Sequence, residues 1–178
     1  KTSVDAKNSQ SRAINARSES IFEKPTFKDA FRTTRCLIPA SGYYEWATAL
    51  GKYPPKQPFY ISPDPQIQSR AFSVAGIWSQ WTTPTGETIT SASIITREAV
   101  GELATIHSRM PVMLPEDRWD IWLDLKNREI ETLIPLMDIP NPAAGLVTRP
   151  VASKVNLVAN NGAELIQAIE LGEAQTLF

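Results

Sequence analysis

Short stretches of alternating apolar and polar residues, separated by turns rich in Gly, Pro, Ser and Thr, dominate this chain. A period of two predicts β-strands that bury one face. Ser41-Gly42 and the run Thr-Thr-Pro-Thr-Gly at 82–86 are typical of the turns that join such strands. The expected strands are Arg35–Pro39, Tyr43–Ala47, Pro58–Ser62, Phe72–Trp78, Thr88–Thr96, Pro111–Leu114 and Gly145–Pro150.

Helical spacing of apolar residues is limited to short segments, and the first of them has Thr26 as its expected N-cap. Because strands outnumber these helices and are joined mainly by hairpin turns, the sequence predicts a mostly antiparallel α+β fold. The first eleven residues are polar and without period, as in a loop or at the cut edge of a domain. The expected helices are Phe27–Thr33, Glu98–Ile106, Glu116–Leu123 and Asn127–Met137.

The composition is that of an ordinary globular domain, with 42% apolar and 21% charged residues among 178. A chain of this length fits one domain and buries a core without disulfides or metals. Its one cysteine and one histidine exclude a disulfide framework, a thiolate zinc site and a histidine-rich metal centre. No apolar run approaches the ~18 residues that span a bilayer. We therefore expect a soluble, cytoplasmic protein that holds no metal and no cofactor.

The net charge of −1 hides an asymmetry along the chain. Residues 1–56 carry ten basic and five acidic side chains, whereas residues 57–178 carry eight and fourteen. A local basic face attracts a polyanion whatever the total charge is, so this balance permits binding to nucleic acid. The balance does not require it, because basic side chains also simply solvate a protein surface.

Glu45 and His107 are the candidates for proton transfer. In its expected strand, alternation puts Glu45 on the face opposite Tyr44 and Trp46. If the Glu45 face is the interior, burial raises the pKa of the carboxyl toward the range useful for acid–base chemistry. A solvent-facing glutamate is the alternative. An imidazole such as His107 suits proton transfer at neutral pH, although a lone histidine is more often a structural residue.

Asn15 and Arg17 belong to a compact polar run, Asn-Ala-Arg-Ser-Glu at 15–19. An asparagine amide orients a reacting group, and an arginine offers a forked donor for phosphate. The alternative for this run is an ordinary helix N-terminus with Ser18 as its cap. Cys36 lies in an apolar strand, where a cysteine is usually inert packing rather than the partner of His107 in a protease dyad.

Blocks of the sequence follow one another in a characteristic order across nearly the whole chain. Together they resemble the SOS response-associated peptidase (SRAP) family, whose members process abasic sites in DNA, and the ordered set is far more specific than any single block. The blocks are INARSE (Ile14–Glu19), FKDAFRTTRCLIPASGYYEW (Phe27–Trp46), KQPFYI (Lys56–Ile61), VAGIW (Val74–Trp78), IITRE (Ile94–Glu98), IHSRMPVML (Ile106–Leu114) and VNLVANNGAELIQ (Val155–Gln167).

The resemblance implies a single domain over residues 1–178, a β-rich, mostly antiparallel and barrel-like α+β fold with short flanking helices. It also implies a positively charged groove for single-stranded DNA. The full-length protein is then expected to remove its own initiator Met, and the Cys exposed at the new terminus forms a covalent thiazolidine with an abasic site. A terminal amine condenses with the aldehyde of the sugar, and the adjacent thiol closes the ring.

Five residues match the family's functional positions. Asn15 matches an asparagine that binds near the terminal cysteine and the sugar, and Glu45 matches a glutamate that transfers protons during Schiff-base formation and methionine removal. His107 matches a histidine that protonates the ring oxygen of the sugar. Arg17 and Arg109 match arginines that hold the phosphates flanking the lesion, a role suited to a bidentate fork. The resemblance implies no metal and no cofactor.

The family's Met-Cys-Gly-Arg start and a Trp-containing segment upstream of the INARSE block are not in this sequence. We expect the chain to be a piece of a longer protein, and cross-linking is expected only of the full-length protein. Two alternatives stay open. One is a peptidase that acts on other proteins with the same Glu45 and His107, and the other is a non-catalytic module that binds single-stranded DNA.

Overall fold

The computed structural model describes residues 13–48, 52–66 and 71–171. Contacts within the chain divide it into two compact units. Unit 1 comprises Lys1–Ala40, Phe72–Glu98 and Arg109–Pro142, and unit 2 comprises Ser41–Ala71, Ala99–Ser108 and Ala143–Phe178.

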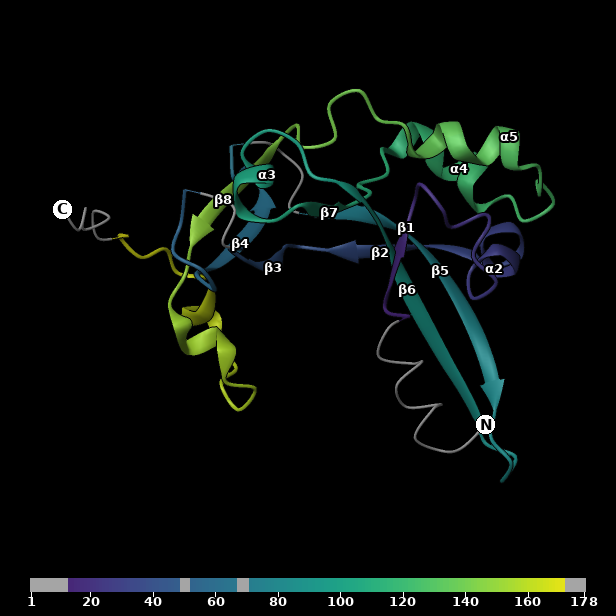
Figure 1. The fold of residues 1–178 in the computed structure, drawn as a ribbon, viewed down its shortest axis with the longest axis horizontal. Coiled ribbons are helices and arrows are strands. Elements are labelled where there is room, and N and C mark those ends of the chain that lie inside the picture. Colours follow the sequence, from purple (N-terminus) through teal and green to yellow (C-terminus); the bar gives the residue numbers. More distant parts are fainter. Residues whose placement is uncertain (1–12, 49–51, 67–70, 172–178) are drawn as a thin grey trace. The chain divides into compact units, whose positions relative to one another are not determined.

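Unit 1 contains a five-stranded sheet in which four strands follow the order β1-β6-β5-β2 and β7 also pairs with β6. The β1–β6 pair is parallel and the other pairs are antiparallel. Figure 1 shows that the β5–β6 hairpin extends well beyond the neighbouring β2. The strands are β1 (Asn15–Arg17), β2 (Arg35–Ala40), β5 (Phe72–Thr82), β6 (Thr88–Glu98) and β7 (Arg109–Pro111).

Short helices cover the core of unit 1. Trp122 lies at the centre of this core, fully buried, with its ring centroid 5.9 Å from that of Phe31. The indole Nε1 donates a hydrogen bond of 2.9 Å to the Cys36 carbonyl, so the buried polar atom of the tryptophan is satisfied. The helical segments are α2 (Lys28–Thr33), the 3₁₀ turn η1 (Glu116–Arg118), α4 (Trp119–Leu123), α5 (Ile130–Leu133) and the 3₁₀ turn η2 (Ile134–Met137).

Arg35 is the buried cation of unit 1, with 2% of its surface exposed. Its guanidinium donates to backbone carbonyls rather than to a carboxylate, among them those of Trp122 at 2.7 Å and Asp124 at 2.7 Å. The carbonyls of Phe31, Arg32 and Asn127 accept further hydrogen bonds from it. One side chain thereby satisfies the carbonyl groups at the ends of α2 and α4, which have no partner within such short helices.

Unit 2 contains a three-stranded antiparallel sheet in the order β3-β4-β8. On one of its faces, Ala47 and Phe59 form a small buried core with Ile106 of α3. On the other face, the ring of Tyr60 lies 5.3 Å from that of Tyr44 and is covered by the guanidinium of Arg149. The elements are β3 (Tyr43–Trp46), β4 (Pro58–Pro63), α3 (Leu103–Ile106), β8 (Leu146–Pro150) and the 3₁₀ turns η3 (Ser153–Asn156) and η4 (Ala163–Ile166).

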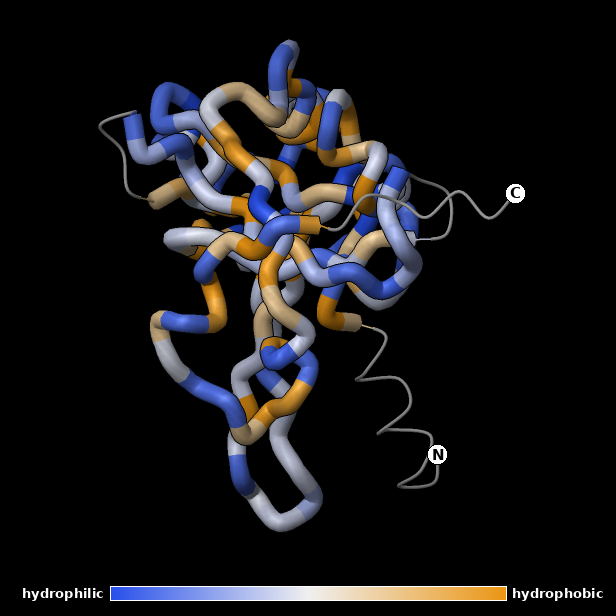
Figure 2. The backbone as a smooth tube through the Cα atoms, turned by 90° about the vertical axis from the view of Figure 1, so that its left-hand side faces the viewer, coloured by the Kyte–Doolittle hydropathy of each residue, from blue (hydrophilic) through white to orange (hydrophobic). Residues whose placement is uncertain are grey.

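The α+β, strand-rich fold predicted from the sequence is confirmed. The described strands form two sheets, and no closed barrel is present among them. β5 continues beyond the predicted Trp78 to Thr82, because it pairs there with β6 although both faces are exposed. β6 begins at the predicted Thr88 and continues to Glu98, because its last residues pair with β7. In Figure 2 the tip of this hairpin is hydrophilic to neutral, which explains why alternation does not reveal where β5 ends.

Several predicted boundaries are wrong. Residues 15–17 form a strand rather than a helix start capped by Ser18, because backbone pairing to β6 decides their conformation. Glu98 belongs to β6, and α3 begins only after Gly101, whose φ of +57° suits glycine and interrupts a helix. The last predicted strand before α4 lies at Arg109–Pro111 instead of Pro111–Leu114.

Two predicted helices are also shorter than expected. The segment expected as Asn127–Met137 is α-helical only over Ile130–Leu133 and continues as a 3₁₀ turn, since Pro135 lacks the N–H group that an α-helix requires. α2 begins at Lys28 and has no side-chain cap, so the N-cap expected at Thr26 is not formed.

In the part of the chain that the structure describes, no helix combines the length and the apolar character required to cross a membrane.

Arg35→Met should destabilise the protein by about 3 kcal/mol or more, because buried and half-buried carbonyl groups lose the charged donor that satisfies them. Arg32→Met is the matched control, since Arg32 is exposed on the neighbouring helix. Urea unfolding monitored by tryptophan fluorescence measures both. Equal midpoints for the two variants would contradict this role of Arg35.

Candidate functional site

Glu45 lies in the middle of β3, on the face that also carries Ala47. Its partner across the sheet is Phe59, which is fully buried, so the carboxyl is drawn toward the apolar interior of unit 2. The Glu45 side chain retains 26% of its exposure, and Oε1 accepts a hydrogen bond of 3.1 Å from the Trp46 backbone N–H. The predicted alternation therefore holds, and Glu45 is half-buried on the sheet face that carries the small core of Ala47 and Phe59.

His107 directly follows α3, where the chain turns into an extended conformation with φ −145° and ψ 150°. The Ile106 carbonyl before it accepts the Thr48 backbone N–H at 2.9 Å, which ties the end of α3 to the residues that follow β3. As a result, Nδ1 of His107 lies 3.8 Å from Oε2 of Glu45. This separation is an ion-pair distance when the imidazole is protonated, and it is longer than a direct hydrogen bond.

Burial raises the pKa of Glu45 above its ordinary value, while the Trp46 N–H and the positive charge of His107 act in the opposite direction. A carboxyl with a raised pKa holds its proton more readily than an exposed carboxyl does, which suits it to acid–base chemistry. The pKa of Tyr43, two residues earlier on the same face, is raised by burial and further by Glu45. Tyr43 was not identified from the sequence as part of the electrostatic environment of Glu45.

Asn15 and Arg17 are both exposed on β1, on either side of the fully buried Ala16. The strand is held to β6 in parallel register, with Asn15 opposite Ile94 and Arg17 opposite Thr96. Because side chains alternate along a strand, burying Ala16 directs the asparagine amide and the guanidinium to the same outer face. These two predicted residues are thus presented together to solvent by unit 1.

Arg109 lies on β7, and its guanidinium is held by two acceptors in unit 1. Nη1 donates a hydrogen bond to Oε1 of Glu19 and Nη2 donates one to Oε2, both at 2.8 Å. Nη2 also donates to the Thr96 carbonyl at 2.6 Å. The Arg109 hydrogen bond lowers the pKa of Glu19, burial opposes this shift, and the backbone N–H groups of Glu19 and Glu98 contribute to it. Glu19 was not among the predicted site residues, and its place in the INARSE block is the only signal for it in the sequence.

Each unit brings together part of the predicted set: Glu45 with His107 in unit 2, and Asn15 with Arg17 in unit 1. Arg109 is found in an ion pair that the sequence did not predict. Cys36 lies in β2, and burial raises the pKa of its thiol, which disfavours the nucleophilic thiolate. No group of three or more His, Cys, Asp or Glu side chains gathers into a metal site within the described ranges.

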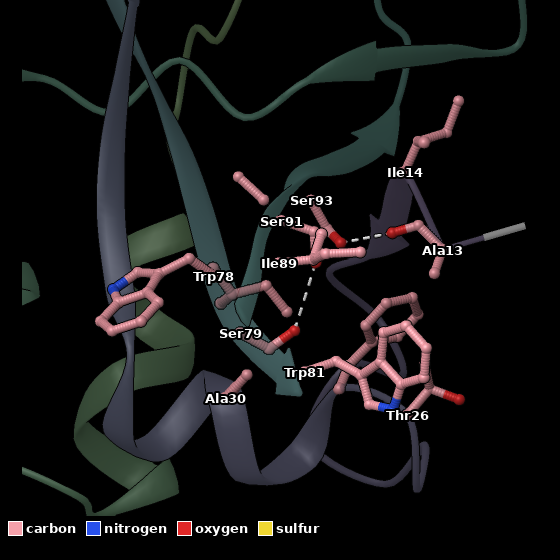
Figure 3. A pocket seen from close by; sticks show the side chains of 13 residues that line it. Ala13, Ile14, Thr26, Ala30, Trp78, Ser79, Trp81, Ile89, Ser91 and Ser93 are labelled. Carbon is pink, nitrogen blue, oxygen red and sulfur yellow. Dashed lines mark hydrogen bonds between the residues drawn. The ribbon is translucent and has the colours of Figure 1, made fainter. Parts of the chain in front are cut away.

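Unit 1 also has an open pocket of about 320 Å³ between one face of the β5–β6 hairpin and α2. Figure 3 shows the side chains of Trp81 and Ile89 from the hairpin among those that line it. The lining contains apolar and hydroxyl side chains and no charged group. None of the five predicted site residues lies in this pocket.

The sequence model of the family described as SOS response associated peptidase (SRAP) matches residues 2–158. The chain belongs to the SRAP family. The abasic site processing protein YoaM of Bacillus subtilis is 38% identical to this SRAP chain over 156 residues, which cover 87% of this chain and 66% of YoaM. The abasic site processing protein HMCES of Mus musculus is 31% identical over 186 residues, covering 91% of this chain and 51% of HMCES. The SRAP chain thus spans less than two thirds of either relative.

Solved structures share the fold of this SRAP chain. A protein from Bacteroides thetaiotaomicron matches with a TM-score of 0.82 and 27% identity, covering 95% of this chain and 71% of that one. A protein from Bordetella bronchiseptica matches with a TM-score of 0.63 and 28% identity, covering 78% and 64% of the two chains. The family resemblance inferred from the ordered blocks is therefore confirmed by both sequence and fold.

Glu45 and Glu19 should give the stability of this SRAP chain opposite pH dependences. The raised pKa of Glu45 contributes stability below the ordinary value of 4.5, and this stability is lost as pH rises through the raised pKa. The lowered pKa of Glu19 contributes stability above 4.5, and this stability is lost as pH falls through the lowered pKa.

Relative to the parent, Glu45→Gln should therefore gain unfolding free energy as pH rises above 4.5. Glu19→Gln should lose unfolding free energy as pH rises toward 4.5 from the acid side. Urea unfolding at a series of pH values measures both differences. A common sign for the two variants would show that at least one of these carboxyls lies in a different environment in solution.

Proposed function

We propose that the protein containing this domain processes abasic sites by binding single-stranded DNA and forming a covalent thiazolidine with the abasic sugar. The two units described above are proposed to constitute one SRAP domain over residues 1–178. The observation that carries the proposal is the pairing of Glu45 and His107 in unit 2. Two curated relatives named abasic site processing proteins support the same reaction class.

The proposed reaction begins at the N-terminal Cys that the family resemblance assigns to the full-length protein. Its α-amine adds to the open-chain aldehyde of the sugar, and the carbinolamine loses one water to give a Schiff base. The thiol sulfur then adds to the imine carbon while its proton passes to nitrogen, which closes the thiazolidine. The bonds formed and broken balance without an oxidant or reductant.

Glu45 and His107 have the properties that these proton transfers require. A carboxyl whose pKa is raised by burial donates a proton to the hydroxyl group that leaves the carbinolamine, and it accepts one from the attacking amine. The imidazole of His107 supplies the proton that the ring oxygen takes up as the sugar opens to the aldehyde. At a separation of 3.8 Å, the positive charge of a protonated His107 favours the ionised form of Glu45 and partly offsets the effect of burial.

The exposed side chains of β1 are proposed to contact the DNA. Arg17 offers a forked donor to a backbone phosphate, and Asn15 on the same outer face hydrogen-bonds near the sugar. Arg109 is assigned to a second phosphate, although in this structure its two Nη groups are bound to Glu19. Cys36 has no part in the proposed reaction, since it lies within a strand and has no terminal amine beside its thiol.

In the full-length protein, Glu45→Gln and His107→Gln should each slow adduct formation by about 100-fold, the lower end of what positioned acid–base groups contribute. Glu87→Gln is the matched control, because Glu87 is an exposed carboxylate at the tip of the β5–β6 hairpin. Intact-mass spectrometry of each protein with a single-stranded abasic oligonucleotide measures the rate.

Parental rates in both variants would remove the assigned roles. Cleavage of unrelated peptides by the mature protein would instead favour a peptidase that acts on other proteins. Tight DNA binding without any adduct would favour a non-catalytic binding module.

Arg17→Gln should weaken binding to single-stranded DNA and reduce the slope of log affinity against log salt by about 0.7, the value for one phosphate contact. Arg128→Gln is the control, since Arg128 is also exposed in unit 1 but lies beside α5. Fluorescence anisotropy over a range of salt concentrations gives both slopes. Identical slopes for the two variants would mean that Arg17 does not contact phosphate.

A further inference from the structure

The contact between Glu19 and Arg109 has the form of an anion-binding site that is already filled. Both carboxylate oxygens of Glu19 accept hydrogen bonds of 2.8 Å from the two Nη atoms, the same bidentate geometry in which a guanidinium binds a phosphodiester. The backbone N–H groups of Glu19 and Glu98 add to the attraction for negative charge at this point. The chemistry of the position therefore favours any oxyanion, not a carboxylate alone.

The two partners of this ion pair are held very differently. The Arg109 side chain is only 22% exposed, and its guanidinium is anchored independently by the Thr96 carbonyl at 2.6 Å. The Glu19 side chain is 52% exposed. Departure of the carboxylate would therefore leave the arginine fork in position, held by the Thr96 carbonyl.

We propose that Glu19 occupies the phosphate position on Arg109 in the DNA-free protein and is displaced by a backbone phosphate when single-stranded DNA binds. This inference rests on the proposed function and refines it. Displacement also removes a negative charge from the path of a polyanion. Glu19 consequently lowers the affinity for DNA and acts as a competitor for Arg109, not as a ligand of the DNA.

The experiment is a double-mutant cycle in the full chain, with a short oligothymidylate that has no abasic site as the probe. Glu19→Gln should tighten binding about two- to fivefold at low salt, the range that corresponds to the free energy of an exposed ion pair. This gain should vanish in the Arg109→Gln background, because the competition acts through that guanidinium. Glu23→Gln, another exposed carboxylate of unit 1, is the control and should show no comparable gain.

The contrary outcomes are distinct. A gain from Glu19→Gln that persists in the Arg109→Gln background would indicate general charge repulsion and overturn the displacement. Weaker binding by Glu19→Gln would mean that the carboxylate orients Arg109 for the DNA, which also overturns it. If the parent itself fails to bind the oligonucleotide, the proposed function fails and this inference with it. If Arg109→Gln does not fold by circular dichroism, Arg109→Lys keeps the charge without the fork, and the gain should shrink there as well.

Discussion

The backbone pairing of β6 is the constraint on which the rest of unit 1 depends. At Ile94 this strand ends its pairing with β5, and from there it is flanked by β1 on one edge and β7 on the other. Thr96 is paired on both sides, and its carbonyl accepts the Ser18 N–H at 2.8 Å as well as Nη2 of Arg109. The exposed residues of β1 and the Arg109 fork are therefore fixed by a single strand whose own side chains take no part in the proposed chemistry.

In unit 2 the important feature is the partial burial of an ionisable group, the carboxyl of Glu45. Transfer of a carboxylate toward an apolar interior costs free energy, and the protein reduces this cost by favouring the protonated form. The cost of burial arises because β3 places Glu45 opposite the buried Phe59. It is reduced because the end of α3 places His107 3.8 Å from the Glu45 carboxylate. The free-energy cost of partly burying Glu45 thus falls on the group that donates and accepts protons in the proposed reaction.

The sequence was sufficient for features that depend on local periodicity. The strand at Tyr43–Trp46 and the two-sided distribution of its side chains were predicted because alternation is a property of neighbouring residues. The strand at Asn15–Arg17 was not, since three residues hold no pattern and its conformation is decided by parallel pairing with residues 94–96. The pair of Glu19 and Arg109 was beyond local reasoning for the same reason, because 90 positions separate its members.

Glu19 and Glu45 are chemically identical, and their environments separate their functions. A guanidinium fork keeps Glu19 ionised, so it can act only as an anion, while partial burial favours a proton on Glu45. The opposite pKa shifts agree with the anionic role proposed for Glu19 and the acidic role proposed for Glu45. This division follows from the neighbours of each residue: an arginine anchored by Thr96 in the first case, and an apolar sheet face with one histidine in the second. Family membership alone does not predict this difference, because both glutamates lie in the matching sequence blocks and their environments are seen only in the structure.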